Sequence, residues 1–347
     1  MTDKKKTIKI MDTTLRDGSH SVRHQFTLED ITAISSALDE SGVYAIEISH
    51  GDGLAGSSIQ YGWSLFSEEE RLSAANQVIK KSKLAVLLLP GIGTREDLQK
   101  AIACGTKMAR IATHVTEADI SEQHIKMCKD MGLEVVTFLM LAHMEPPSKV
   151  LEQGKLMESY GADVVYVVDS AGAMLPDDVR AKVGLLREHL KIEVGFHAHN
   201  NLGLGIGNTL AAIEEGATAV DGSLCGMGGG SGNAATEVLA AVLDRAGYDT
   251  GVNLYKMMDA AEEIVRPRML RPQIIDRSSL ALGYAGVYSS FLLHTYKAAE
   301  RFKVDPLDVL IELGKRRVVG GQEDMIVDVA YELARSKSKN RQGSMGS

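Results

Sequence analysis

The chain has 347 residues, of which 44% are hydrophobic and 24% charged, values that are typical of a globular protein and exclude a wholly disordered one. A net charge of −8 and an aromatic content of 5% disfavour a nucleic-acid partner, and no apolar run approaches the roughly 18 residues of a membrane span. Three scattered cysteines predict no disulfide framework, and the first ten residues lack the apolar segment of a signal peptide, so we expect a cytoplasmic protein.

Eight short apolar runs recur along the first two thirds of the chain. They are rich in Val, Ile and Leu and do not alternate strictly with polar residues, which is typical of strands buried on both faces of a parallel sheet. The runs are Ile8–Met11, Tyr44–Ile48, Leu84–Leu89, Met108–Val115, Leu133–Leu141, Ala162–Val168, Ile192–Phe196 and Ala219–Leu224.

Amphipathic segments that predict helices separate these runs. Thr27–Ser41 opens with Thr27, has Asp30 three residues later, close to a capping box, and is followed by Gly42 as a C-terminal cap. The others are Thr94–Ala103, Glu117–Met131, Pro147–Tyr160, Pro176–His189, Gly205–Glu215, Ala234–Gly247 and Leu254–Val265. Eight strands alternating with helices over about 250 residues predict an α/β protein, a (β/α)8 TIM barrel. The alternative, a doubly wound open sheet, usually has a glycine-rich first turn, where this chain has Arg16-Asp17-Gly18.

The pattern changes at about Arg266, beyond which no buried strand run remains. Helices are predicted over Leu280–Phe302, Pro306–Leu313 and Glu323–Ala334. We therefore expect a TIM-barrel domain over residues 1–265 and a small all-helical domain over residues 266–335. Residues 336–347 are polar and rich in Gly and Ser, and we expect them to form a disordered tail.

The active site of a barrel forms at the C-terminal ends of its strands, so polar residues there are the candidates. The sharpest pattern is His197-Ala198-His199, because residues two apart in a strand point to the same side. Two imidazoles and the carboxylate of Asp17, at the end of the first strand, would bind a divalent metal and leave positions open for water or substrate. Taken singly, the histidines could be ordinary hydrogen-bonding residues and Asp17 a cap.

Other polar residues at strand ends have two readings each. Arg16 is a structural ion-pair partner or a binder of a carboxylate or enolate, and His20 is a general base or a spectator. Ser170 lacks a GxSxG elbow, so it is a substrate-binding residue or a turn cap rather than a nucleophile. Asn233 ends a glycine-rich loop that begins at Gly226, and it either binds the metal or caps the next helix.

These motifs together are more specific than any one of them. The opening Asp12-Thr-Thr-Leu-Arg-Asp-Gly-Ser-His20, the segment His197-Ala-His-Asn-Asn-Leu-Gly203 and the loop Gly226-Met-Gly-Gly-Gly-Ser-Gly-Asn233 resemble the metal-dependent class II aldolases of the HMG-CoA-lyase-like barrel superfamily. The extended opening from Leu15 to Phe26 is most similar to the 4-hydroxy-2-oxovalerate aldolase family within it. The resemblance covers the chain from about Ile8 to Ala334.

The resemblance implies a retro-aldol reaction, in which 4-hydroxy-2-oxopentanoate is cleaved to pyruvate and acetaldehyde in the breakdown of aromatic compounds. It implies that Asp17, His197 and His199 bind Mn2+ or another divalent ion such as Mg2+ or Co2+. Arg16 would stabilise the enolate, and His20 would take the proton of the C4 hydroxyl. The substrate-binding residues implied in this way are Arg16, Asp17, Ser170, His197 and Tyr288.

The resemblance also implies a partner, an acylating NAD-dependent acetaldehyde dehydrogenase that receives the reactive aldehyde, and it assigns the interface to the C-terminal helices. Tyr284 and Tyr288 lie four apart, so on a helix they would share a face. Leu87 and Leu89, two apart in the third strand, either belong to the barrel core or line the space for the substrate's C5 methyl group. The segment Gly51–Trp63 is either a lid or a plain loop.

Two alternative functions stay open. An acyl-CoA lyase or an isopropylmalate-type synthase would keep the fold, although the sequence has no obvious basic cluster for the phosphates of CoA. A non-catalytic barrel that serves as an assembly subunit would be expected to lack a metal ligand, and Asp17, His197 and His199 are all present.

Overall fold

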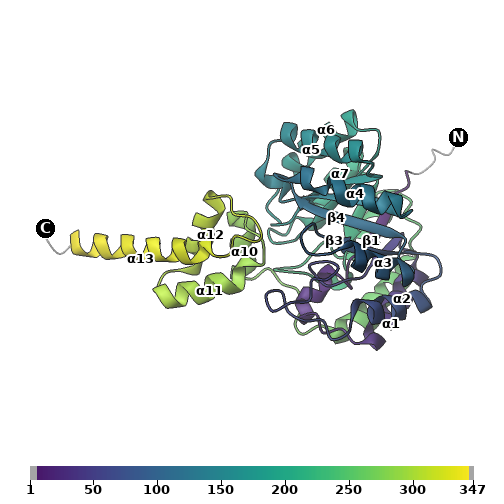
Figure 1. The fold of residues 1–347 in the computed structure, drawn as a ribbon, viewed down its shortest axis with the longest axis horizontal. Coiled ribbons are helices and arrows are strands. Elements are labelled where there is room, and N and C mark those ends of the chain that lie inside the picture. Colours follow the sequence, from purple (N-terminus) through teal and green to yellow (C-terminus); the bar gives the residue numbers. More distant parts are fainter. Residues whose placement is uncertain (1–5, 344–347) are drawn as a thin grey trace.

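The computed structural model describes residues 6–343 and has a closed barrel of eight strands at its centre (Figure 1). Neighbouring strands are parallel, and β1 closes the barrel by pairing with both β2 and β8. The strands are β1 (Lys9–Asp12), β2 (Ala45–Glu47), β3 (Lys83–Leu88), β4 (Met108–His114), β5 (Glu134–Met140), β6 (Val164–Asp169), β7 (Glu193–Ala198) and β8 (Ala219–Gly222). The predicted TIM barrel is therefore confirmed.

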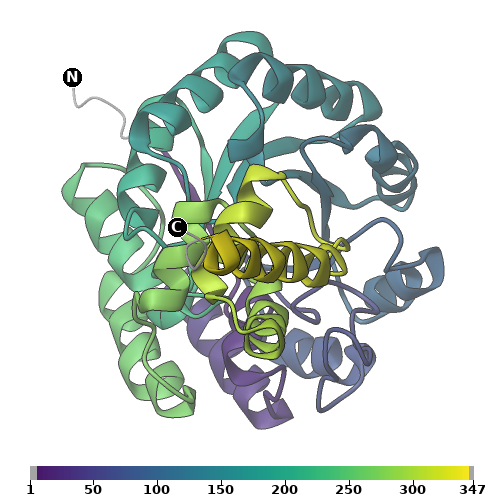
Figure 2. The same cartoon turned by 90° about the vertical axis from the view of Figure 1, so that its left-hand side faces the viewer.

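Helices follow the strands along the chain and form a ring around the barrel (Figure 2). They are α1 (Leu28–Ser41), α2 (Glu68–Val78), α3 (Arg95–Ala103), α4 (Glu122–Asp130), α5 (Pro147–Tyr160), α6 (Pro176–His189), α7 (Gly205–Glu214), α8 (Thr236–Arg245) and α9 (Leu254–Asp259). The predicted capping box of α1 is present, since Thr27 Oγ1 accepts from the Asp30 N–H. The sequence analysis missed α2, whose mostly polar residues give a weak apolar stripe although Ser67 and Glu70 form a capping box at its start.

The barrel is a packed core rather than a channel. Its interior is filled by a cluster that includes Met11, Leu87, Phe138 and Tyr166, and a larger apolar layer lies between the strands and the surrounding helices. This packing holds the strands on both faces, so the loops that follow their C-terminal ends start from fixed positions.

The C-terminal helices form a second body with its own core. After a π-helix (Ala260–Val265) and a 3-10 turn (Arg266–Arg268) come α10 (Arg277–Ala285), α11 (Phe291–Phe302), α12 (Pro306–Lys315) and α13 (Met325–Gly343). Their core contains Phe291, Leu310 and Val329. Figure 1 shows these helices projecting from one end of the barrel, and in Figure 2 they lie in front of its opening.

Two details of this region differ from the sequence analysis. The single helix predicted over Leu280–Phe302 is two helices, because Gly286 adopts a left-handed conformation (φ 68°) that ends α10. Tyr288 therefore lies outside a helix and does not share a face with Tyr284, which is 74% exposed. The disordered tail was expected from Ser336, whereas α13 continues to Gly343, and residues 344–347 lie outside the described part of the chain.

None of the helices in residues 6–343 combines the length and the apolar character needed to cross a membrane.

Candidate active site

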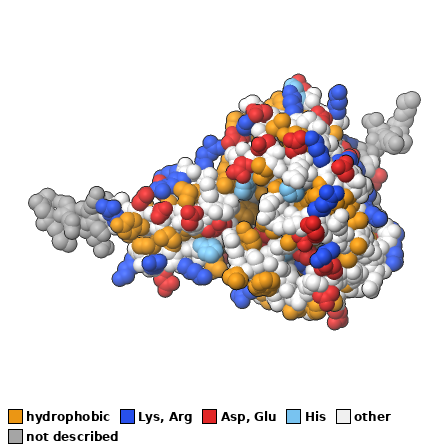
Figure 3. Space-filling view, in the orientation of Figure 1, with side chains coloured by type: hydrophobic (Ala, Val, Ile, Leu, Met, Phe, Trp, Pro, Cys, Tyr) orange, Lys and Arg blue, Asp and Glu red, His pale blue; other side chains and the backbone are white. Residues whose placement is uncertain are grey.

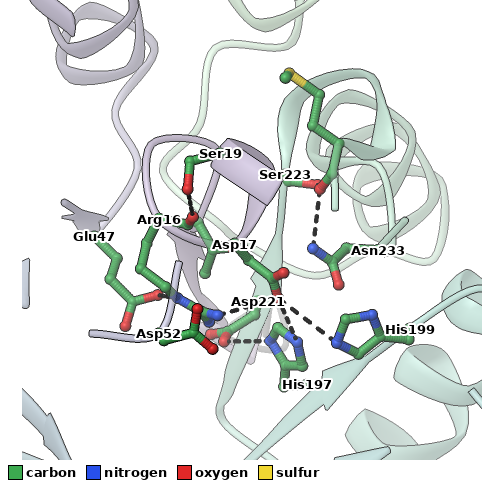
Figure 4. Close-up of polar contacts among 12 residues, drawn as sticks. Arg16, Asp17, Ser19, Glu47, Asp52, His197, His199, Asp221, Ser223 and Asn233 are labelled. Carbon is green, nitrogen blue, oxygen red and sulfur yellow. Dashed lines mark hydrogen bonds and ion pairs between the residues drawn. The ribbon is translucent and has the colours of Figure 1, made fainter. Parts of the chain in front are cut away.

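The structure brings Asp17, His197 and His199 together at one end of the barrel (Figure 4). Asp17 follows β1 and begins a 3-10 helix (Asp17–Val22), whereas the histidines lie at the end of β7. Asp17 Oδ2 is 3.4 Å from His197 Nε2 and 3.6 Å from His199 Nε2. All three side chains are buried. Their convergence follows from the topology, because β1 and β7 both flank β8.

Asp221, on β8, fixes the orientation of the His197 ring. Its Oδ2 atom lies 2.8 Å from His197 Nδ1 and accepts a hydrogen bond from it. In a neutral ring with its proton on Nδ1, the lone pair of Nε2 would face Asp17, 3.4 Å away. Histidine ligands of metals commonly donate their second ring nitrogen to a carboxylate in this way, so His197 is oriented as a metal ligand would be.

The charge states of Asp17 and His199 suit a cation, whereas the carboxylates of Asp17 and Asp221 raise the pKa of His197 against the effect of its burial. Burial lowers the pKa of His199 to about 4, so this imidazole is neutral at neutral pH. Burial by itself would raise the pKa of Asp17, but the Arg16 guanidinium and the two imidazoles hold it well below its usual value. A neutral imidazole and an ionised carboxylate are the forms of these side chains that bind metals.

Asn233 adds a further candidate ligand. Its Nδ2 atom donates to the Met227 carbonyl oxygen at 3.0 Å, whereas its Oδ1 atom is buried without a hydrogen-bond partner. The backbones of His199 and Asn233 form an isolated β-bridge, so this oxygen lies beside the histidine. Asn233 does not cap α8, which follows Ala235 and has no side-chain cap. An unsatisfied oxygen beside two imidazoles and a carboxylate is the donor set of a divalent-metal site, so these residues fit such an ion.

Arg16 is ion-paired and also lies at the pocket. Its Nε atom donates to Glu47 Oε2 at 2.7 Å, and its Nη1 atom is 3.2 Å from Asp17 Oδ2. The guanidinium is almost completely buried, yet it also lines the pocket beside the Asp17 group. Arg16 is thus ion-paired on one side and faces the space for a ligand.

The pocket beside this group is completed by the C-terminal domain. Tyr288, in the segment between α10 and α11, lines it together with Ser170, whose Oγ atom accepts from the Leu141 N–H at 3.0 Å. Leu87 and Leu89 both line it, in agreement with their predicted common direction. The remaining lining residues are Gly51, Asp52, Ala112, Phe138, Met140 and Val168, with Arg16, Asp17, His197 and His199.

His20 lies next to the pocket wall. It is adjacent to Gly51 and forms a group with His24 and Asp52, in which the side-chain nitrogen and oxygen atoms lie within 4.8 Å of one another. The His24 ring lies edge-on to His20 and stacks on His50 with centroids 3.8 Å apart. Burial lowers the pKa of His24 to about 2 and that of His50 to about 4, so both are neutral neighbours of His20.

A larger cavity of about 430 Å3 adjoins the pocket and extends towards the C-terminal helices. It reaches Val319 and Glu323 of that domain, and the surface is hollowed where the helices meet the barrel (Figure 3). The two spaces are adjacent, because several residues line both: Asp52, Leu89, Ala112, Met140, Ser170 and Tyr288.

The sequence analysis missed three buried charged residues that support the site. Glu47 on β2, Arg110 on β4 and Asp221 on β8 are almost completely inaccessible and form ion pairs with one another and with site residues. Each lies within a run of apolar strand residues, and a charge at such a position is costly unless it is paired. That exception to the apolar pattern is the signal by which the sequence could have identified them.

Comparison with known proteins agrees with this architecture. The HMGL-like family model matches residues 7–264, and the DmpG-like communication domain model matches residues 273–335. Among solved structures, the carboxyl transferase domain of Rhizobium etli pyruvate carboxylase has the same fold, with a TM-score of 0.80 over 96% of this chain and 61% of that one at 16% identity.

Full-length relatives give a narrower assignment. The 4-hydroxy-2-oxovalerate aldolase of Moorella thermoacetica is 63% identical over 96% of this chain and 99% of its own length. The 4-hydroxy-2-oxovalerate aldolase of Pelotomaculum thermopropionicum is 64% identical over 96% of this chain and 98% of its own length. The chain therefore belongs to the HMGL-like family and, within it, to the 4-hydroxy-2-oxovalerate aldolases.

Proposed function

We propose that this chain cleaves 4-hydroxy-2-oxopentanoate to pyruvate and acetaldehyde by a metal-dependent retro-aldol reaction, in the catabolism of aromatic compounds. The observation that carries the proposal is the single pocket lined by Arg16, Asp17, His197 and His199 in a chain of this family. Cleavage of the C3–C4 bond leaves an enolate on the pyruvate fragment, and a guanidinium beside a cation site is what that negative charge requires.

Asp17, His197 and His199 would hold the divalent ion, which we propose is Mn2+, with Mg2+ and Co2+ as alternatives. When bound, the ion would supply Lewis acidity to the oxygen on which the enolate charge develops. No lysine is among the described residues that line either cavity, so a Schiff base has no nucleophile here.

The remaining roles belong to the chain's own residues. His20 would take the proton of the C4 hydroxyl, so that the C4–O bond becomes the aldehyde carbonyl as the C3–C4 bond breaks. The electron pair of the broken bond passes to the enolate, whose charge the Arg16 guanidinium would neutralise. Ser170 and Tyr288 would contact the substrate, since both line the same pocket as the ligand group.

The aldehyde would leave through the larger cavity. Acetaldehyde is small and reactive, and the space lined by Leu89 and Tyr288 continues to Glu323 in the C-terminal domain. We propose that residues 266–335 form the interaction domain and pass the aldehyde to an acylating NAD-dependent acetaldehyde dehydrogenase. The match of residues 273–335 to a communication domain supports this proposal.

The partner can be tested by substituting an exposed apolar residue of that domain. Leu293 on α11 is 62% exposed, so Leu293→Glu should weaken co-purification with the dehydrogenase and leave pyruvate release unchanged. Val238→Glu on α8, a partly exposed position of the barrel, serves as the matched control. Removal of residues 272–347 should leave a barrel that binds metal but has lost aldolase activity and the partner. A shortened chain with full activity that still co-purifies with the dehydrogenase would contradict the proposal.

The reaction itself is tested by a coupled assay for pyruvate release from 4-hydroxy-2-oxopentanoate, without CoA. Activity should be lost in EDTA and restored by Mn2+. Release that depends on CoA would favour an acyl-CoA lyase or an isopropylmalate-type synthase of the same fold. No release from a metal-loaded protein, with or without CoA, would favour a non-catalytic assembly subunit.

A further inference from the structure

Arg110 is a buried charge in the interior of the barrel. It lies in the middle of β4, is completely inaccessible, and its guanidinium carbon lies 4.4 Å from the centre of the Phe138 ring and 5.2 Å from that of Tyr166. A guanidinium in such apolar surroundings is costly unless carboxylates pair with it. The identity of its partners therefore indicates its role.

Both partners of Arg110 are residues that hold the site. Its Nη2 atom donates to the two oxygens of Asp221, at 2.7 and 2.6 Å. Its Nη1 atom lies 3.2 Å from Glu47 Oε2, an ion pair without hydrogen-bond geometry. One guanidinium thus joins strands β2 and β8, which lie on opposite sides of β1 in the barrel.

Each carboxylate uses one oxygen for two contacts. Asp221 Oδ2 accepts from Arg110 and also from His197 Nδ1 at 2.8 Å. Glu47 Oε2 contacts Arg110 and also accepts from Arg16 Nε at 2.7 Å, while Glu47 Oε1 is buried without a partner. Figure 4 shows Glu47 beside Arg16 and Asp221 beside His197. A displacement of either carboxylate therefore displaces the site residue bound to the same oxygen.

We infer that Arg110 is a positioning residue that sets two parts of the site at once: the ring of the metal-binding histidine His197, through Asp221, and the enolate-binding guanidinium of Arg16, through Glu47. This inference rests on the proposed function. Arg110 itself touches neither the ligand pocket nor the proposed metal ligands, so its effect passes through the two carboxylates. The planar fork of arginine can reach two carboxylates in fixed directions, which a lysine ammonium cannot reproduce.

The test compares a substitution of Arg110, which contacts both carboxylates, with substitutions of each carboxylate alone. Asp221→Asn should weaken the affinity for Mn2+ about 10- to 100-fold, with kcat largely recovered at saturating Mn2+. Glu47→Gln should lower kcat at saturating Mn2+ about 10- to 100-fold and leave the Mn2+ affinity near that of the wild type. Arg110→Met should lower both quantities, because it releases both carboxylates. Mn2+ affinity is measured by calorimetry on the metal-free protein, and kcat by pyruvate release.

Two further variants keep the test decisive. Arg110→Lys retains the buried charge and should fold even if Arg110→Met does not, and it should also lower both quantities, because an ammonium group cannot reproduce the guanidinium fork. Arg187→Met removes a partly buried guanidinium that donates to the Ile192 carbonyl oxygen before the start of β7, and it should change neither quantity. A folded Arg110→Met or Arg110→Lys variant with wild-type affinity and kcat would overturn the inference. If the wild type releases no pyruvate, the proposed function fails, whereas the Mn2+ affinities of the Arg110 variants still test the link to His197.

Discussion

Gly51 lies so close to His20 that a Cβ atom at this position would be 2.5 Å from both Cε1 and Nε2 of the imidazole. The same atom would be 2.7 Å from Cε1 of His24. The φ angle of Gly51 is not in the left-handed region, so the constraint is one of space rather than of backbone conformation. The missing side chain of Gly51 is what lets the two rings approach the pocket wall.

Gly51→Ala should therefore displace His20 and lower kcat by about tenfold or more, because a small misplacement of a reacting group is costly. The Mn2+ affinity should be unchanged, since the atoms nearest to the added Cβ belong to His20 and His24 and not to the proposed ligands. Gly207→Ala on α7 is the matched control, because a Cβ there would meet no atom within 4 Å. Wild-type kcat in Gly51→Ala would show that the position of His20 is not critical.

The metal site predicts a joint loss of binding and turnover. In His197→Ala or His199→Ala, one of three ligating side chains is removed from a buried site, so both the bound metal and pyruvate release should be abolished. Elemental analysis of the purified variants measures the first and the coupled assay the second. Unchanged metal content together with retained activity would place the ion elsewhere.

His20→Ala should lower kcat by about 100-fold or more, the usual contribution of a general base, and should remove the acid limb of the pH–rate profile. Arg16→Lys should also lower kcat strongly, because a single ammonium group cannot pair with Glu47 and Asp17 and still present two donors to the enolate. Both variants should keep their metal. An unchanged pH profile in His20→Ala would identify His20 as a spectator.

The two leucines predict a change of specificity. Because Leu87 and Leu89 line the pocket, Leu87→Ala or Leu89→Ala should favour longer aldehydes, each added methylene shifting the preference by about 1–3 kcal/mol at most. The measurement is kcat/KM for a series of aldehydes in the aldol direction. Equal losses for every aldehyde would mean that the substitution has only damaged the barrel core.

Asp12 predicts a pH dependence of stability. Burial raises its pKa to about 6, whereas the unfolded carboxyl titrates near about 3.9. Its raised pKa stabilises the fold fully below about pH 4, and this contribution is lost as the pH rises through about 6. Asp12→Asn should retain the hydrogen bonds to the Thr14 N–H and the Thr236 hydroxyl and exceed the wild type in stability at pH 7 by up to about 3 kcal/mol. Urea unfolding from pH 4 to pH 7 measures the difference, which should vanish at the acid end.

The alternation of elements and the strand-end motifs were predictable from the sequence because they are local. The apolar runs predicted the barrel, and the spacing of His197 and His199 predicted that both imidazoles lie on one side of β7. The supporting charges could not be paired from the sequence, since Arg110 and Asp221 are 111 residues apart and meet only across the closed barrel. The helical pattern of the sequence continues past Gly286, so it did not predict the end of α10 there. The position of Tyr288 in the pocket lining could therefore not be predicted either.

The network around Arg110 also has a charge balance. Among its buried ion-paired members, the three carboxylates of Asp17, Glu47 and Asp221 outnumber the two guanidinium groups of Arg16 and Arg110 by one. A divalent ion held by the proposed ligands would reverse that excess. With the proposed ion bound, the site would attract an anionic 2-oxo acid, and without the ion the same site would repel one.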